Sequence, residues 1–101
     1  MRVIMYVSMP VEVFNAAVRD GSAGPKIQKI LAAQRPEAVY FTDLGGQRTG
    51  VLVVDLVDAS GIPALAEPWF LAFEAEVEIH PAMTPADLGA AGLDKLGKEW
   101  G

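Results

Sequence analysis

The stretch that decides the fold is PEAVYFTDLGGQRTGVLVVDLV, from Pro36 to Val57. It contains two apolar runs, at 38–42 and 50–57, with a turn that includes the pair Gly45 and Gly46 between them. Adjacent glycines between two β-forming runs are typical of a tight hairpin. We therefore predict two antiparallel strands here, with the turn over 44–48.

Apolar spacing predicts alternating strands and helices on both sides of the hairpin. A β-forming run at 3–9, closed by Pro10, predicts a first strand, and the alternating AEVEIH at 75–80 predicts a fourth. Between Pro10 and Gln34, apolar residues recur at spacings of three and four, and a Gly-rich break at 21–25 interrupts them. We expect two helical pieces in this region.

Two further helices are predicted after the hairpin. Ser60 is expected to cap a helix that carries an apolar stripe over 62–73, and Pro68 is expected to kink or split it. The motif TPAD at 84–87 combines a capping threonine, a proline in the first turn and a carboxylate, which predicts one last helix over 85–100.

The predicted order is β-α-β-β-α-β plus a terminal helix, within one domain over residues 1–101. This is the ferredoxin-like pattern of an α+β protein, in which helices cover one face of a four-stranded antiparallel sheet. The third strand, VLVVDLV at 51–57, is apolar on both faces apart from Asp55, whereas a strand with one wet face should alternate. We therefore expect a second copy to cover the open face, giving a homodimeric α/β barrel. The alternative is that the C-terminal helix folds back over its own sheet.

Composition excludes several functions. The net charge of −5 and the sequence pI near 4.6 disfavour nucleic acid as a partner. The chain of 101 residues has no cysteine, so disulfides, thiolate metal sites and a cysteine nucleophile are excluded. No secretory cleavage pattern or membrane-length apolar segment occurs, which makes a soluble cytoplasmic protein the expectation.

Four segments carry a resemblance to a known family: PEAVYFTD at 36–43, GGQRTG at 45–50, IPALAEPWFLAF at 62–73 and EVEIHPAMTPADL at 76–88. With them the chain resembles the dimeric α/β-barrel superfamily, and in particular small bacterial proteins like those of the domain-of-unknown-function group numbered 3303. It is more loosely similar to muconolactone isomerases. The resemblance implies a ferredoxin-like homodimer, and it implies no catalytic residue, because the matching positions are turns and core.

Strand alternation assigns one face of each strand to the side away from the helices. The residues of this open face are Arg2, Ile4, Tyr6, Ser8, Ala38, Tyr40, Thr42, Val51, Val53, Asp55, Glu76, Glu78 and His80. The antiparallel pairing of the first and fourth strands is expected to bring Arg2 toward His80 and Tyr6 toward Glu76. Two tyrosines beside carboxylates and an imidazole could bind a small aromatic or oxygenated molecule and move a proton.

His80 and Asp55 are the candidate catalytic residues. His80 is the only histidine, so it is the natural general base. Asp55 interrupts an apolar strand, and a buried carboxylate there would need Arg2, Arg48 or a backbone donor as its partner. The candidate ligand-binding residues are Tyr6, Tyr40, Arg2 and Glu78.

Each candidate also has a purely structural interpretation. His80 stands at a strand end before Pro81, where it is half-exposed in many proteins, and the tyrosines suit half-buried sheet positions. Alternating glutamates on the fourth strand, from Glu74 to Glu78, keep an edge strand soluble. The turn from Gly21 to Lys26 enters a helix and could hold an anion, but it lacks the phosphate-loop spacings, and an ordinary helix break is the better explanation. No metal or cofactor is predicted.

Three classes of function remain open at this point. The first is a small soluble homodimer that binds a small molecule in or beside the barrel. The second is a cofactor-independent monooxygenase-like or isomerase-like enzyme that acts on a small aromatic or oxygenated substrate. The third is a structural component of an oligomer without a ligand. A polar-lined cavity that contains Asp55 or His80 would favour the second class.

Overall fold

The computed structural model describes the whole chain, residues 1–101. Its elements, in chain order, are β1 (Arg2–Met9), α1 (Val11–Asp20), α2 (Ala23–Gln34), β2 (Ala38–Leu44), β3 (Gln47–Asp55), the short 3-10 turn η1 (Ala59–Gly61), α3 (Ile62–Phe73), β4 (Glu76–Pro81), α4 (Pro85–Gly89) and α5 (Leu93–Trp100). The predicted order β-α-β-β-α-β is therefore confirmed, with the first helical region divided in two at Gly21 as expected.

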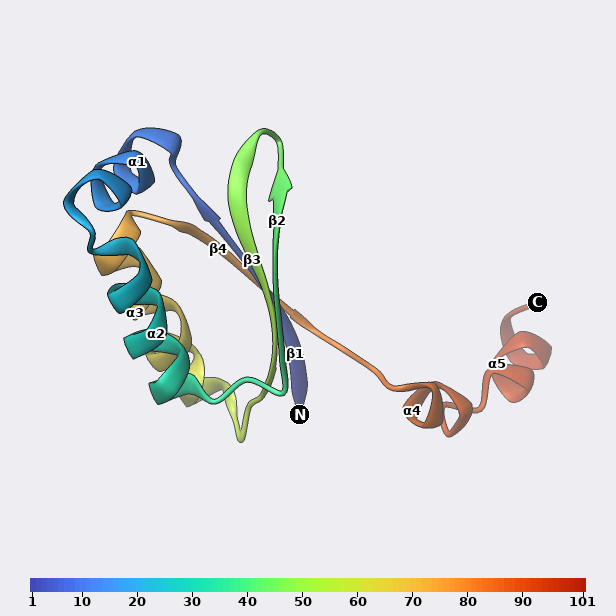
Figure 1. Cartoon of the computed structure of the whole chain (residues 1–101). Coiled ribbons are helices and arrows are strands. Elements are labelled where there is room, and N and C mark those ends of the chain that lie inside the picture. Colours follow the sequence, from blue (N-terminus) through green and yellow to red (C-terminus); the bar gives the residue numbers. More distant parts are fainter.

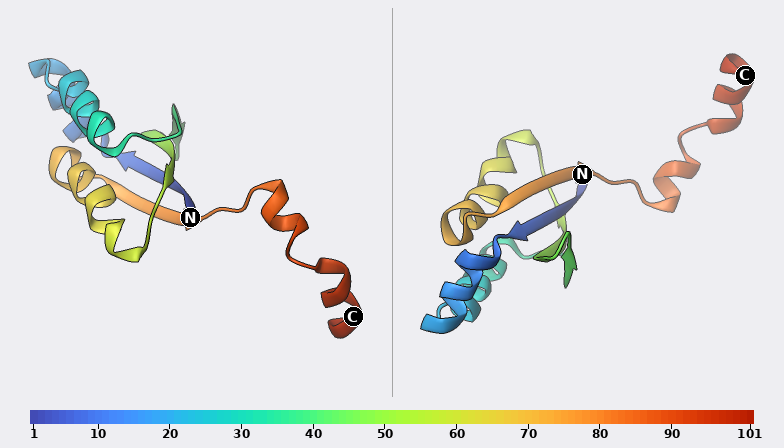
Figure 2. Two further views of the ribbon diagram at one scale, coloured as in Figure 1. Left: turned by 90° about the horizontal axis from the view of Figure 1, so that it is seen from below. Right: turned by 90° about the horizontal axis from the view of Figure 1, so that it is seen from above.

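The four strands form one antiparallel sheet in the order β2-β3-β1-β4. Helices α1, α2 and α3 lie together against one face of this sheet, and the opposite face carries no helix (Figure 1). The views from below and from above agree on this two-layer arrangement (Figure 2). The α+β fold predicted from the sequence is thus confirmed.

The β2-β3 hairpin turns at the predicted glycine pair. Leu44 pairs with Gln47, so the loop consists only of Gly45 and Gly46, whose φ angles are 59° and 77°. Positive φ at both loop positions matches the right-handed twist of the strands, and it is the conformation that side chains with a Cβ disfavour. The strands run closer to the turn than predicted, because pairing extends to the residues that flank the glycines.

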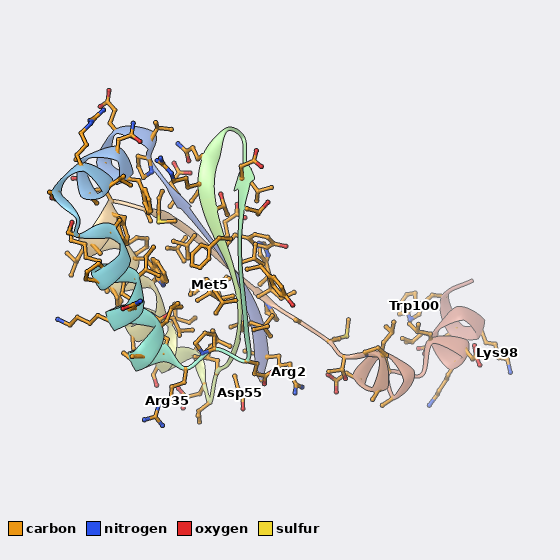
Figure 3. The ribbon with its side chains drawn as sticks, viewed as in Figure 1. Arg2, Met5, Arg35, Asp55, Lys98 and Trp100 are labelled. Atoms are coloured by element: carbon orange, nitrogen blue, oxygen red, sulfur yellow. The ribbon has the colours of Figure 1, made fainter.

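The core lies between the sheet and the three helices. Alternate residues of β1, from Val3 to Met9, point toward the helices and are buried, as Figure 3 shows for Met5. From α3, Trp69 and Phe73 are fully buried, and their rings stack with centroids 6.2 Å apart. The prediction that the apolar stripe of this helix is core is confirmed for these two residues, whereas Phe70 is partly exposed.

The side chain of Gln34 links α2 to α3 through three hydrogen bonds. Gln34 donates from Nε2 to the carbonyl oxygens of Ala64, at 3.3 Å, and Leu65, at 2.9 Å, and its Oε1 accepts from Trp69 Nε1 at 3.2 Å. Helix α3 passes through Pro68 without the split that was one of the two predicted outcomes, and this contact offers a physical reason. Pro68 has no N–H to donate to the carbonyl of Ala64, four residues earlier, and the Gln34 amide supplies a donor in its place.

Two other local predictions need correction. Ser60 does not cap α3, because it lies in η1, where the carboxylate of Asp58 accepts hydrogen bonds from the Ser60 backbone and hydroxyl. These bonds lower the pKa of Asp58. The last helix is two helices, since Gly92 adopts a left-handed φ of 72° between α4 and α5. The predicted capping box at the start of α4 is present, with Thr84 and Asp87 bonded to each other's backbone N–H.

The segment Ala82–Gly101, hereafter the arm, leaves the end of β4 and points away from the body of the protein (Figures 1 and 2). The chain therefore has a radius of gyration of 16.9 Å and a longest dimension of 59 Å. A compact domain of this length would have a radius of gyration of about 13 Å. Every residue from Pro85 onward is exposed, so the arm does not fold back over its own sheet. No helix is long and apolar enough to cross a membrane.

Candidate functional site

The open face of the sheet is organised in rows that run across the strands. One row joins Ala38, Val53, Ile4 and His80, and the next joins Tyr40, Val51, Tyr6 and Glu78. The central residues of these rows are half-buried, while the outer ones on β2 and β4 are mostly exposed. The open face thus has an apolar centre of Ile4, Val51 and Val53 with polar groups at its edges. Strand alternation predicted these eight residues for the open face correctly.

Tyr6, Glu78 and His80 lie together at one side of this apolar centre. The rings of Tyr6 and His80 meet edge to face, with centroids 5.9 Å apart and planes inclined by 74°. His80 Nε2 lies 3.4 Å from Glu78 Oε2. The cluster offers an aromatic surface, a hydroxyl, an imidazole and a carboxylate to whatever covers the open face.

The pairing within this cluster differs from the expected register. Ile4 rather than Arg2 pairs with His80, and Tyr6 pairs with Glu78 rather than Glu76. In the observed register Pro81, the last residue of β4, pairs with Val3. The shift is two residues, and since the side-chain period of a strand is also two, every side chain stays on the predicted face.

Arg2 stands apart from the cluster. Its Nε donates to Glu37 Oε2 at 2.9 Å, and both side chains are about half exposed. This hydrogen bond and the charge of Glu37 raise the pKa of the Arg2 guanidinium. A guanidinium already engaged by one carboxylate is less free to bind a second anion, so the geometry weakens the case for Arg2 as a ligand-binding residue.

Asp55 is not the buried carboxylate that the sequence suggested. It is the last residue of β3, its side chain is 72% exposed, and it accepts a hydrogen bond from the amino group of Met1 at 3.1 Å. Arg2 and Asp55 lie at the same end of the sheet (Figure 3), where the register places them opposite each other. Arg48, the other expected partner, bonds instead to Asn15 Oδ1. Asp55 is thus an exposed polar residue at the end of β3, one row along the open face from the row that contains His80.

Tyr40 lies on β2, the far edge strand, and is 70% exposed. In its row, Val51 separates it from Tyr6. Two strand spacings amount to about 10 Å, so the two tyrosines flank the apolar centre and do not touch. Of the six predicted site residues, the structure brings Tyr6, Glu78 and His80 together and places Tyr40, Arg2 and Asp55 around them.

A cavity on the other side of the sheet was missed by sequence reasoning. It has a volume of about 300 Å³, lies between the hairpin and helices α1 and α2, and is lined by Met9, Phe14, Ile27, Phe41, Thr42, Arg48 and Thr49. Arg48 is fixed there, with its guanidinium carbon 4.6 Å from the centre of the Phe14 ring. Only the sequence signal of two threonines and an arginine beside the hairpin turn could have indicated it. None of the hollows in the structure is lined by Asp55 or His80.

Other candidate sites gain no support. The turn at Gly21 is closed by Asp20, whose carboxylate accepts from the Ser22 N–H at 2.8 Å, and hydrogen bonding to Ser22 lowers the pKa of Asp20. The negative charge of Asp20 would repel an anion at this turn. No group of three or more potential metal-ligating side chains occurs.

Comparison with known proteins assigns this chain to no family. No protein-family model and no curated protein matches this chain. The crystal structure of MupZ from Pseudomonas fluorescens is similar over 97% of this chain and 83% of that chain, with a TM-score of 0.42 and 19% sequence identity. No residue role follows from a likeness at this level.

Proposed function

We propose that this protein is a homodimer of the dimeric α/β-barrel type, whose two open sheet faces meet and enclose a site for a small aromatic or oxygenated molecule. The observation that carries the proposal is the apolar centre of the open face, Ile4, Val51 and Val53, which no element of the chain covers. Apolar groups on a wet sheet face cost free energy that a second copy recovers by excluding water.

A two-fold pairing explains the distribution of polarity on this face. In an isologous interface each sheet meets the same surface of its partner, so the apolar centres pack together and the polar edges stay at the rim. Tyr6, Glu78 and His80 then line the margin of the interior. Tyrosine and histidine present an apolar body with a polar tip, which suits a ligand with an aromatic ring and an oxygen substituent.

Proton transfer by His80 is the second candidate function, and the contact of His80 with Glu78 and Tyr6 favours it. Imidazole is the side chain best matched to proton transfer near neutral pH, and a neighbouring carboxylate can orient it. A cofactor-independent isomerase or monooxygenase would use this group on a bound aromatic substrate. Asp55 is two positions from Val53 along β3 and would take part only if the substrate extended past His80.

The dimer is tested by the mass of the protein in solution. Light scattering at micromolar concentration should give twice the chain mass, and Val53→Glu, which puts a charge in the apolar centre, should raise the dimer dissociation constant at least 100-fold. Val57→Glu is the matched control, because Val57 is 95% exposed beyond the end of β3. A monomeric wild-type protein, or a Val53→Glu variant as dimeric as the control, would refute the proposed interface.

The ligand site is tested separately. Native mass spectrometry of protein purified from its source should identify a bound small molecule. Tyr6→Phe and His80→Ala should weaken its binding about tenfold, each by loss of one polar contact. Asp55→Asn tests whether the site extends to the strand end. If binding is unchanged in Tyr6→Phe and His80→Ala, the ligand binds elsewhere. The cavity near Arg48 is then the next candidate site.

A further inference from the structure

The arm presents an apolar stripe that the body of the protein leaves uncovered. Helix α5 carries Leu93, Leu96 and Trp100 at spacings of three and four, and all are exposed, Trp100 at 81%. Figure 3 shows Trp100 on the arm, far from the body. Helices of five and eight residues, such as α4 and α5, are too short to be stable in water without packing. A surface outside the chain's own body must therefore cover the stripe.

The charges of α5 limit which surface that is. Successive residues of a helix are rotated by about 100°, so Glu99 borders the stripe, whereas Lys98 lies on the opposite side. Gly97 is on the stripe side, and a side chain added there would meet no neighbouring atom. The stripe is thus bordered by a glycine on one side and by an acidic residue on the other. It fits an apolar groove with a basic rim.

Such a groove runs between α2 and α3 on the outer surface of the helical layer. It has a volume of about 380 Å³, and its lining is apolar except for two lysines: Ile30, Ala33, Pro68, Leu71, Ala72, Lys26 and Lys29. Leu71 is 82% exposed, so the groove is also uncovered. No acidic residue lines it.

We propose that the arm of each copy docks on the other copy, with the α5 stripe seated in the partner's α2-α3 groove and Glu99 directed to Lys26 and Lys29. The inference rests on the proposed dimer. The arm continues directly from β4, an edge strand of the open face, so it begins at the margin of the proposed interface and extends away from its own helices. Reciprocal docking covers both stripes and both grooves, and it makes the dimer harder to separate than the sheet faces alone would.

The absence of native cysteines allows a direct test by cross-linking. In the full-length double variant Leu71→Cys and Leu96→Cys, oxidation should give a covalent dimer that runs at twice the chain mass on a non-reducing gel. Leu96→Cys with Val57→Cys is the control, because Val57 is exposed and lies outside the groove. Equal cross-linking in both double variants, or a disulfide formed only within one chain, would overturn the docking site.

A charge reversal adds a second readout. Glu99→Lys should weaken the dimer about three- to tenfold, and Lys26→Glu with Lys29→Glu in the same chain should restore most of the loss. A dimer that keeps its full affinity in Glu99→Lys contradicts the arm contact but leaves the sheet interface standing. A monomeric wild-type protein, by contrast, overturns the proposed dimer and the docked arm with it.

Discussion

The Gln34 side chain is expected to contribute measurably to stability, because it bonds α3 at the point where Pro68 removes a backbone donor. Gln34→Ala leaves the buried Trp69 indole N–H without an acceptor and the Ala64 carbonyl without a donor. An unsatisfied buried group costs about 1–3 kcal/mol, and Ala64 is an exposed residue, so we expect a loss of about 2 kcal/mol in the free energy of unfolding. This would lower Tm by about 8–16 °C at the usual 4–8 °C per kcal/mol for a small domain.

A double-mutant cycle isolates the bond between the two side chains. Trp69→Phe removes the indole N–H and leaves a small cavity, and we expect a loss of about 2 kcal/mol. The shared hydrogen bond can be lost only once, so the double variant should lose about 3 kcal/mol rather than 4, a coupling of about 1 kcal/mol. Urea unfolding followed by circular dichroism, at one protein concentration because the proposed dimer is linked to folding, measures each value.

The control replaces Gln34→Ala with Gln28→Ala in the same cycle. Gln28 lies on the same helix but is exposed, so its cycle with Trp69→Phe should show no coupling. A coupling below about 0.3 kcal/mol between Gln34 and Trp69, the usual limit for independent sites, would refute the role given to this contact.

Three shorter predictions concern the hairpin, the arm and the cavity. Gly46→Ala, at a φ of 77°, should lower the free energy of unfolding by about 1–2 kcal/mol in a thermal melt, and an unchanged Tm would contradict the turn. Hydrogen bonds from the Thr84 backbone and hydroxyl lower the pKa of Asp87, so the cap stabilises α4 fully above the pKa of a free aspartate and is lost as the pH falls through the lowered pKa. Thr84→Ala removes the hydroxyl but keeps the backbone N–H, so it should move the pKa of Asp87 only part of the way up toward its ordinary value in an NMR titration. No movement would exclude the hydroxyl as a cause of the lowered pKa. Arg48→Ala should cost about 1 kcal/mol through loss of its contact with the Phe14 ring, whereas Arg48→Lys should cost less; equal losses in urea unfolding would argue against the cation–π contact.

Most of the fold could be predicted because its signals are local. The alternation of Val3 to Met9, the glycine pair at the hairpin and the capping box at Thr84 each depend on neighbours within a few residues. Errors arose where a distant residue decides the outcome. Helix α3 passes through Pro68, and Gln34, far away in sequence, supplies a hydrogen bond there that the local pattern cannot show.

The sequence predicted which face of the sheet carries the candidate site, but it did not predict which residues of the site touch each other. A strand period of two places Tyr6, Glu78 and His80 on the open face whatever the register, so alternation alone identifies the set. Which of them touch depends on the register of β4 against β1, and alternation along a strand does not fix that register. The sequence could also not show that Asp55 is exposed, since burial depends on what packs above a strand end.

The sequence by itself determined the order of the elements, the two faces of the sheet and the apolar excess of the third strand, because these follow from periodicities of two and 3.6 residues. Only the tertiary structure decided which surfaces remain uncovered. The open sheet face and the stripe of α5 are apolar patterns of the same chain, yet β4 directs the arm away from the body, so neither covers the other. Local pattern specifies that a surface must be buried, and the path of the chain in space decides whether the chain can bury it.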